Sequence, residues 1–342
     1  MSRHVHPGAV SRASKSLPIV AQPVPVPVKS PSAAALPVEF ADCTPYVAAG
    51  ELTQLSVLYE PARRALWMRM HPQPQPCFTT ELLQEILRVF DAVRLDGTVD
   101  FCVFGSALAG IFNTGGDLAL FASAIRRDEQ DELRKYAYLC CEAVYEAYRG
   151  LGRDIIGIAL VEGSALGGGF EAALAHQYVF AQKDAKLGFP EIAFNLFPGM
   201  GAYSFVSRRT NRRLCQQLIT SGTAHTAEWC AEQGLVDTVF DPGQGVAVVR
   251  AHIDSLRPRL NGVKAMFRAQ RRVDGLTHDE LLDITDDWVD AAFRLSDPEL
   301  AYMEKLVKLQ RKRVGTSAAT ESARTASCAH GQARPQAASR CS

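Results

Sequence analysis

The stretch Glu162-Gly-Ser-Ala-Leu-Gly-Gly-Gly-Phe-Glu171 joins an apolar, β-type run at 155–161 to a helical pattern that continues to about residue 176. Its three consecutive glycines, 167–169, allow a sharp turn and leave their amide groups open to a ligand. Amides at the start of a helix lack a partner within the helix and attract negative charge, as a developing oxyanion requires. Tight packing of the helix on the strand would explain the glycines equally well. No Gly-Lys-Ser/Thr follows and no dinucleotide fingerprint surrounds them, which excludes a P-loop and a Rossmann site.

Two glutamates near this stretch are candidates for proton transfer. Glu171 lies in the first turn of the predicted helix, where a carboxylate also simply complements the helix dipole. Glu191 follows Gly188-Phe-Pro190, and proline is a natural first residue of a helix. Apolar neighbours surround Glu191 in the sequence, so we expect desolvation to raise its pKa towards the range useful for acid–base catalysis. Taken alone, each glutamate is also compatible with a structural role.

Other reactive side chains have weaker support. Asp117, after Gly115-Gly116, is expected to cap the helix that follows or to fix the glycine turn. Cys140 and Cys141 lie inside a helical pattern and are expected to be buried packing residues. The sequence has no Gly-x-Ser-x-Gly elbow of a serine hydrolase. Its eight histidines form no metal-binding pattern, so we predict no metal and no cofactor.

Outward from this centre, the periodicity predicts an α/β protein. Apolar runs at 52–60 and 65–71 indicate a hairpin, and further short strands are expected at 99–104, 155–161 and 178–181. Helical patterns cover 80–95 and 118–151, the second as one long helix or a pair, and the helices 279–295 and 298–313 follow near the end. Strands that alternate with helices favour an α/β body.

Composition bounds the class of protein. Residues 1–38 hold seven of the eighteen prolines and four cationic side chains without an acid, and 315–342 have almost no large apolar groups. We therefore predict a disordered Pro-rich extension at 1–40, a core at 41–260, a helical region at 261–314 and a disordered tail at 315–342. The net charge of the whole chain is zero, which leaves the body acidic and unsuited to nucleic acid. No apolar run reaches the length of a membrane span, and nine scattered cysteines favour a reduced, cytoplasmic protein.

Four segments in register resemble the crotonase (enoyl-CoA hydratase/isomerase) superfamily. They are Phe112-Asn-Thr-Gly-Gly-Asp117, Ala165-Leu-Gly-Gly-Gly-Phe-Glu171, Leu187-Gly-Phe-Pro-Glu191 and Phe197-Pro-Gly-Met-Gly201. The resemblance, over about 45–315, implies a crotonase-like spiral of ββα units with a C-terminal helical region, and a homo-oligomer, trimer or hexamer. It also implies that the amides of Gly116 and Gly168 form an oxyanion hole and that Glu171 and Glu191 are catalytic. We expect Glu171 to be the base and Glu191 the acid, although the sequence leaves this assignment open.

A narrower resemblance is to the diffusible-signal-factor synthases, bacterial enzymes that make cis-2-enoic acids for quorum sensing. It rests on Gly-Gly-Asp-Leu-Ala-Leu-Phe121, the long helix after it, Gly169-Phe-Glu-Ala-Ala-Leu174 and the segment 196–205, where Ala202-Tyr203 replaces the Gly-Gly of ordinary crotonases. It implies that a 3-hydroxyacyl thioester on acyl carrier protein is dehydrated and then hydrolysed to the free acid. The alternatives are an enoyl-CoA hydratase or hydroxyacyl-CoA hydrolase of primary metabolism acting on acyl-CoA, and a non-catalytic crotonase-fold protein that binds a signalling partner.

An acyl substrate needs an apolar tunnel and an anionic carrier needs cations at its mouth. Tyr203 is expected either to shape the acyl pocket or to support Glu191, with plain helix packing as the alternative. The candidate acyl-binding residues are Leu118, Phe121, Phe170, Leu174, Phe194, Leu196, Met200 and Tyr203. The candidate cations, which an ordinary solvated surface explains as well, are Arg126, Arg127, Arg208, Arg209, Arg212 and Arg213.

Overall fold

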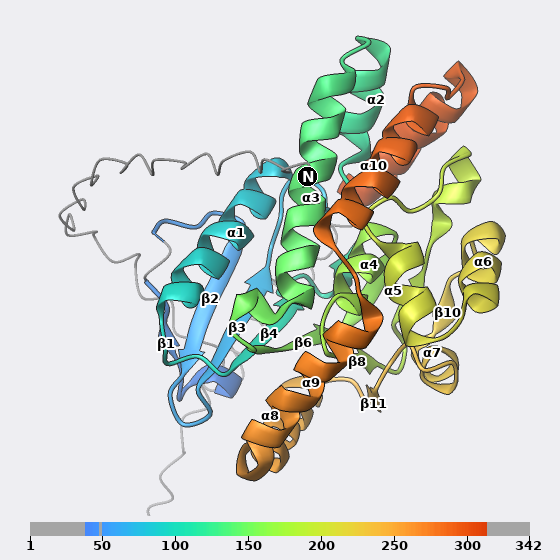
Figure 1. The fold of residues 1–342 in the computed structure, drawn as a ribbon. Helices are drawn as coiled ribbons and strands as arrows, with labels where there is room; N and C mark the ends of the chain where they lie inside the picture. Colours follow the sequence, from blue (N-terminus) through green and yellow to red (C-terminus); the bar gives the residue numbers. More distant parts are fainter. Residues whose placement is uncertain (1–37, 48–49, 313–342) are drawn as a thin grey trace, which may run out of the picture.

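The computed structural model describes residues 38–47 and 50–312, which form two β-sheets surrounded by helices (Figure 1). The predicted extension 1–40 lies almost entirely, and the tail 315–342 entirely, outside the described residues. The larger sheet has the order β1 (Thr44–Pro45), β2 (Leu55–Glu60), β3 (Ala65–Met70), β4 (Phe101–Ser106), β6 (Ile156–Val161), β8 (Tyr178–Gln182) and β11 (Thr238–Phe240). The smaller sheet has the order β10 (His225–Thr226), β9 (Lys186–Gly188), β7 (Gly163–Leu166) and β5 (Gly110–Asn113).

The two sheets are built by a repeated unit. After the antiparallel hairpin β2–β3, the pairs β4–β5, β6–β7 and β8–β9 each give one strand to the large sheet and one to the small sheet. A helical segment follows each pair, and neighbouring units pair in parallel. These segments are α2 (Leu118–Arg126) with α3 (Gln130–Tyr148), α4 (Gly168–Leu174), and the 3-10 helix η3 (Pro190–Phe194) with α5 (Ala202–Arg209). The predicted α/β spiral of ββα units is confirmed.

The strands of the small sheet were not predicted. Each has two to four residues, too few for a period of two to show, and β7 lies inside the glycine-rich run that we interpreted as a turn. This short strand positions the glycines, because Gly167 follows directly after it and donates a backbone hydrogen bond of 2.9 Å to the carbonyl of Gly188 in β9.

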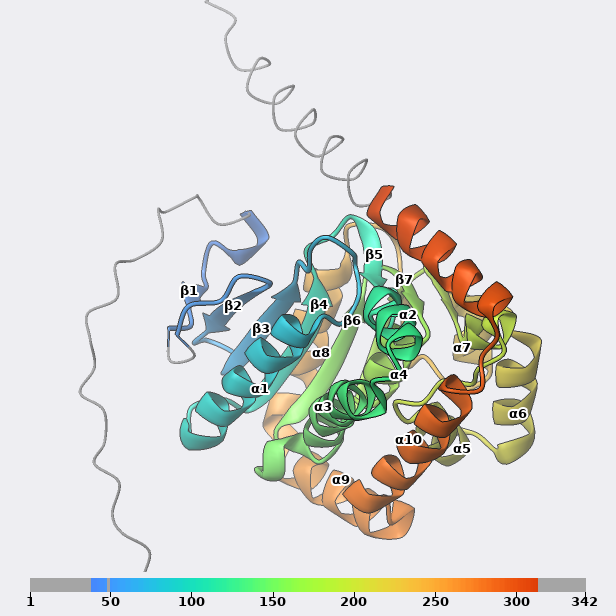
Figure 2. The same ribbon diagram turned by 90° about the horizontal axis from the view of Figure 1, so that it is seen from above.

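The large sheet is buried on both faces. Along β3, Leu66, Met68 and Met70 pack with α1 (Thr80–Leu95) and α3 on one face, whereas Ala65 and Trp67 pack with α8 (Gly245–Leu256) on the other. Figure 2 shows α1 and α3 on one side of the large sheet and α8 on the other. Burial on both faces explains why its central strands are continuously apolar.

Helix boundaries follow from local capping. Helix α1 has the predicted bounds, and the Thr79 hydroxyl accepts the Leu82 N–H at its start. Asp117 accepts the N–H groups of Ala119 and Leu120, which confirms its predicted role as the cap of α2. The predicted pattern 118–151 is a helix pair that breaks at Asp128, whose φ is 56°.

The C-terminal region is helical, as predicted. Helices α9 (Leu260–Asp274) and α10 (His278–Ala292) precede a last helix at 297–312. Helix α10 lies along α3 (Figure 1), where Asp286 accepts hydrogen bonds from Arg134 and Tyr138. Among the described residues, none of the helices has the length and apolar character needed to cross a bilayer. The remaining helices are α6 (Arg212–Ser221) and α7 (Ala227–Glu232).

Candidate active site

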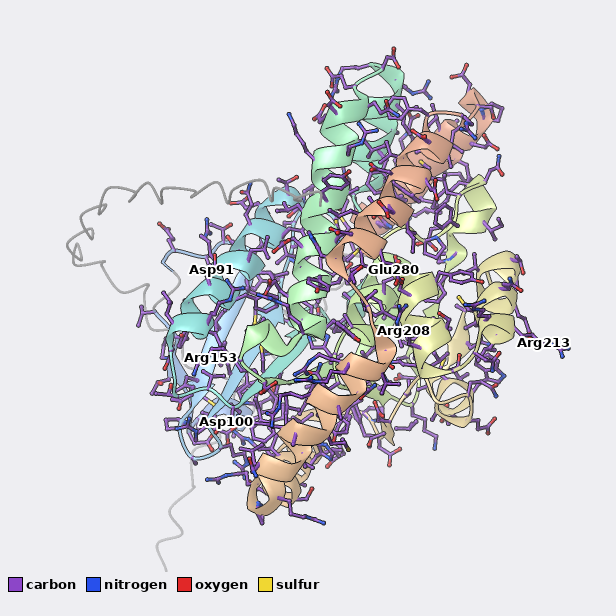
Figure 3. The ribbon with its side chains drawn as sticks, viewed as in Figure 1. Asp91, Asp100, Arg153, Arg208, Arg213 and Glu280 are labelled. Carbon is purple, nitrogen blue, oxygen red and sulfur yellow. The ribbon has the colours of Figure 1, made fainter. Side chains whose placement is uncertain are left out.

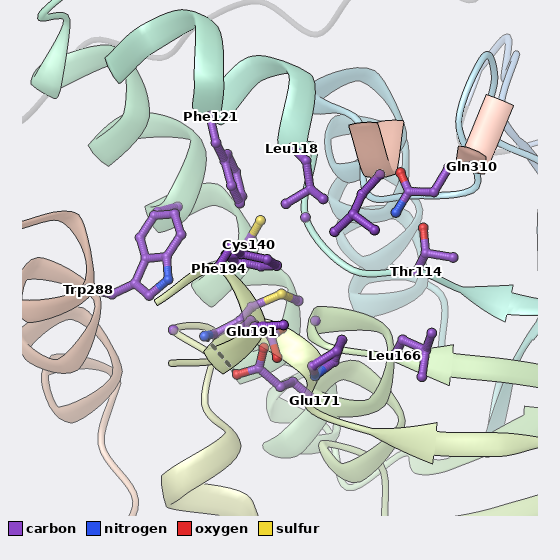
Figure 4. Close-up of a pocket in the computed structure, with 18 of the residues that line it drawn as sticks. Thr114, Leu118, Phe121, Cys140, Leu166, Glu171, Glu191, Phe194, Trp288 and Gln310 are labelled. Atoms are coloured by element: carbon purple, nitrogen blue, oxygen red, sulfur yellow. Dashed lines mark hydrogen bonds between the residues drawn. The ribbon is translucent and has the colours of Figure 1, made fainter. Parts of the chain in front are cut away.

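A largely apolar cavity of about 280 Å³ lies between α2, α3, η3, α10 and the last helix (Figure 4). Glu171 and Glu191 line the same part of it, and Gly116 and Gly168 line it as well. The structure therefore brings together all four residues that the sequence proposed for chemistry. No three His, Cys, Asp or Glu side chains in the described part of the chain gather as metal ligands would.

The Glu171 carboxylate is buried but accepts backbone hydrogen bonds. Its side chain projects from α4, and the residue is 1% exposed. One carboxylate oxygen, Oε1, accepts the backbone N–H groups of Met200 and Ala202, each at 2.8 Å. Burial raises its pKa to about 7, and these two hydrogen bonds oppose the rise because they favour the charged form.

Glu191 differs from Glu171 in its hydrogen bonding. It lies on η3 and the residue is partly exposed, but its carboxylate oxygen Oε2 is buried and has no hydrogen-bond partner among the described residues. Burial, with the nearby Glu171 charge, raises the pKa of Glu191 well above its usual value. Its other oxygen, Oε1, lies against Gly167, where a Cβ would be only 2.1 Å away. A carboxyl group in this setting holds its proton and can donate it.

The two candidate oxyanion residues are glycines because no side chain fits there. A Cβ on Gly116 would lie 2.4 Å from the ring of Phe121, and one on Gly168 would lie 2.8 Å from the sulfur of Met200. The same Cβ on Gly168 would be 3.4 Å from the Gly116 nitrogen, so the two backbone segments run side by side. The two glycines are therefore neighbours in space in the cavity lining.

Helix α10 packs against the turn whose backbone N–H groups bind Glu171. The Thr285 hydroxyl, on a side chain that is 1% exposed, donates to the carbonyl of Gly199 at 2.8 Å. Trp288, one turn later, packs so closely on Gly199 that a Cβ there would be 2.4 Å from the indole. Both residues were missed in the sequence, because they lie about ninety positions after the turn in an ordinary amphipathic pattern. The contact thus adjoins the segment whose amides, those of Met200 and Ala202, bind Glu171.

The acyl-binding predictions divide into two groups. Leu118, Phe121, Phe194 and Met200 line the cavity. Four other candidates lie outside the lining, because their side chains leave α4, α5 and the adjoining segments on other faces; they are Phe170, Leu174, Leu196 and Tyr203. The lining residues that the sequence analysis missed include Ala137, Cys140, Trp288, Tyr302, Leu306 and Leu309.

Tyr203 and Phe170 show where the excluded side chains go. The Tyr203 hydroxyl accepts a hydrogen bond of 3.3 Å from the amide of Gln216 on α6, outside the cavity lining. The ring of Phe170 stacks on Phe189 with centroids 5.2 Å apart, in the core. The packing interpretation of Tyr203 thus fits its position. Cys140 and Cys141 are buried, as predicted, and burial raises the pKa of the Cys141 thiol to about 12.

Most arginines that we expected at the cavity mouth are paired with groups of the chain itself. Arg208 forms an ion pair of 2.7 Å with Glu280, and Figure 3 shows the two facing each other between α5 and α10. Arg213 projects away from α6 into solvent (Figure 3). The members with partners within the chain are Arg126, Arg127, Arg208 and Arg209.

Comparison with known proteins identifies the family. The enoyl-CoA hydratase/isomerase family model matches residues 66–273. The chain is 28% identical over 169 residues to the 2,3-dehydroadipyl-CoA hydratase of Escherichia coli K12, covering 49% of this chain and 62% of that protein. It is 27% identical over 165 residues to the fatty acid oxidation complex subunit alpha of Pseudomonas putida F1, covering 48% and 22%. The chain thus spans less than two thirds of the length of these curated relatives.

Solved structures share the fold. The enoyl-CoA hydratase of Bacillus halodurans has a TM-score of 0.63 at 19% identity and covers 77% of this chain and all of its own. The enoyl-CoA hydratase structure from Geobacillus kaustophilus HTA426 has a TM-score of 0.60 at 21% identity, covering 75% and 96%. Pseudomonas aeruginosa DspI has a TM-score of 0.55 at 21% identity, covering 66% and 85%. With a family match over more than half of its length, the chain belongs to the enoyl-CoA hydratase/isomerase family of the crotonase superfamily.

Proposed function

We propose that the chain dehydrates a 3-hydroxyacyl thioester between Glu171 and Glu191 and then hydrolyses the enoyl thioester, releasing a cis-2-unsaturated acid. One observation carries the proposal: two buried carboxyl groups with different hydrogen-bond environments line the same apolar cavity. Pairs of titratable groups whose surroundings differ in this way divide the roles of acid and base between them.

In the first step Glu171 removes the α-proton of the bound thioester. Its ionised form is favoured by the N–H groups of Met200 and Ala202, and its pKa of about 7 makes it an effective base near neutral pH. The electron pair moves to the thioester oxygen, where the amides of Gly116 and Gly168 would stabilise the enolate.

In the second step Glu191 protonates the departing 3-hydroxyl, which leaves as water while the C2–C3 double bond forms. Glu191 suits this role because burial and the Glu171 charge keep it protonated. The step leaves Glu191 ionised and Glu171 protonated. Hydrolysis then needs one water, which ionised Glu191 deprotonates as it attacks the thioester carbon, and the same amides would stabilise the tetrahedral oxyanion. The C–S bond then breaks, and the thiolate takes the proton held by Glu171 and leaves as a thiol, which restores both glutamates.

The acyl tail would extend from the glutamates towards Phe121 and Trp288. Figure 4 shows these rings at one end of the cavity, and their centroids are 5.0 Å apart in an edge-to-face contact. A closed apolar end suits an uncharged hydrocarbon chain. The carrier-bound substrate, the cis double bond and the role in quorum sensing rest on the resemblance to the diffusible-signal-factor synthases. The wider crotonase resemblance supports a homotrimer or hexamer, which light scattering after gel filtration would test.

The second candidate function is reversible hydration of an enoyl-CoA, which the names of the curated hydratase relatives favour. It uses the same two glutamates in the reverse direction and releases no free acid. Product analysis therefore separates the two functions.

The test is to incubate the protein with 3-hydroxyacyl thioesters of carrier protein and of CoA, over a range of chain lengths, and to identify products by mass spectrometry. Free cis-2-enoic acid from the carrier-protein substrates would support the synthase. Interconversion of hydroxyacyl- and enoyl-CoA without acid release would support the hydratase. If neither substrate is turned over, both proposals are wrong. Glu171→Gln is the control for contaminating activity.

A further inference from the structure

The last helix, 297–312, forms one wall of the cavity. Tyr302, Leu306, Leu309 and Gln310 line it from this helix. Tyr302 and Leu309 are 40% and 50% exposed, so this wall reaches the protein surface. Arg126 of α2 forms ion pairs with Asp297 and Glu304 of this helix.

The cavity has a distinct acyl end and carrier end. Gly116 and Gly168, whose amides are proposed to hold the thioester oxygen, line it together with Glu171 and Glu191. Figure 4 shows Trp288 on one side of the cavity and Gln310 beside Thr114 on the opposite side. A substrate whose tail points to Trp288 therefore has its thiol carrier on the side of Gln310, where the last turns of the helix lie.

Those last turns carry exposed cations, and the one acid next to them in sequence, Glu304, is paired with Arg126. Lys305, Lys308 and Arg311 are exposed, and the segment 305–312 contains no Asp or Glu. None of the three has an ion-pair partner within the described ranges 38–47 and 50–312. Arg126 and Arg208, in contrast, form ion pairs with glutamates of the same chain.

We propose that Lys305, Lys308 and Arg311 form the docking surface for an acidic carrier protein that delivers the acyl thioester through its phosphopantetheine arm. The proposal rests on the proposed thioester chemistry and names the partner of that same site. Residues spaced by three lie in a slowly winding stripe, and positions 305 to 311 span roughly 9 Å of helix. Charges spread along an exposed stripe match an extended acidic surface, whereas a nucleotide phosphate requires donors that converge on one point.

The experiment compares the triple variant Lys305→Gln/Lys308→Gln/Arg311→Gln with wild type on two substrates of the same acyl chain. One is the 3-hydroxyacyl carrier protein and the other is the uncharged 3-hydroxyacyl-N-acetylcysteamine thioester. We expect kcat/KM on the carrier protein to fall about tenfold, mainly through KM, and to fall less at high salt. Turnover of the uncharged thioester should stay within twofold of wild type.

A matched control removes three exposed cations elsewhere on the molecule, Arg257→Gln/Arg259→Gln/Arg272→Gln on η4 (Arg257–Arg259) and α9. This variant should behave as wild type on both substrates, which separates docking from net charge. Binding of the holo carrier protein, measured by calorimetry, should weaken in the first triple variant alone. This readout needs no turnover, so it tests docking even if the proposed chemistry is wrong.

Three results would overturn the docking proposal. An equal loss of kcat/KM on both substrates would show that the helix only lines the cavity and does not bind the carrier protein. An unchanged carrier-protein affinity would leave the stripe as solvated charge. A loss with acyl-CoA as large as that with the carrier protein would assign the cations to the nucleotide phosphates instead.

Discussion

Replacing Gly167 with alanine tests whether the position of Glu191 controls catalysis. A Cβ at this site would lie 2.1 Å from the Glu191 oxygen Oε1, whereas an ordinary carbon–oxygen contact is roughly 3.3 Å. The carboxyl group must therefore move by about 1 Å, a displacement that typically costs on the order of 10²-fold in rate. The backbone of Gly167, with φ 54° and ψ −128°, adds about 1–3 kcal/mol of strain for a residue with a Cβ.

The assay is kcat for dehydration, measured with circular dichroism and thermal melting to establish that the variant is folded. Gly275→Ala provides the control, because this residue also has a positive φ, 59°, but has nothing within 4 Å of its Cβ position. We expect a modest loss of stability and unchanged kcat for Gly275→Ala, and a loss of about 10²-fold for folded Gly167→Ala. If folded Gly167→Ala keeps its rate within threefold of wild type, the placement of Glu191 does not limit the chemistry.

Three further predictions concern the two carboxyl groups and the closed end of the cavity. Glu171→Gln and Glu191→Gln should each lose at least ~10²-fold in kcat while keeping the wild-type fold, and near-normal turnover of either variant would refute the two-carboxyl mechanism. The raised pKa of Glu191 means that the folded state holds a proton which the unfolded state releases near its ordinary value of 4.5, so stability falls as pH rises from there through the folded pKa. Glu191→Gln should lose less stability between pH 5 and 8 than wild type does, and equal slopes in thermal melts would contradict the assignment. Trp288→Ala should shift preference towards longer acyl chains in competition assays analysed by mass spectrometry, whereas an unchanged profile would show that the indole does not limit chain length.

The sequence predicted those parts of the site that are formed by residues close together in the chain. Glu171 and the glycines before it belong to one strand-to-helix connection, so their proximity follows from the sequence alone. The cap at Asp117 and the bounds of α1 also follow from short-range hydrogen bonding and a period of 3.6 residues. Sequence reasoning failed where contacts are distant, as with Trp288, which reaches the cavity only because α10 packs along α3.

Four of the eight acyl-binding candidates lie outside the cavity lining for a second reason. An apolar side chain close to the candidate catalytic residues can lie either in the cavity or in the core. Its hydrophobicity does not show which of the two it occupies. Phe170 immediately precedes Glu171 on α4, so its side chain points about 100° away around the helix and packs on Phe189. Cys140, which the sequence suggested was only packing, is buried and lines the cavity as well.

The proposed assignment of base and acid to the two glutamates depends on backbone amides that no sequence motif reveals. In sequence, Glu171 and Glu191 are equivalent: each sits at the start of a short helix among apolar residues. In the fold, the segment 199–202, bound by Thr285 at Gly199, directs two N–H groups towards Glu171 and none towards the buried oxygen of Glu191 among the described residues. Two hydrogen bonds to the charged form favour ionisation, whereas an unpartnered buried oxygen disfavours it. Under the proposed mechanism, the turn that follows both glutamates therefore selects Glu171 as the base, and a change at Thr285 should alter the acid limb of the rate profile before it alters substrate affinity.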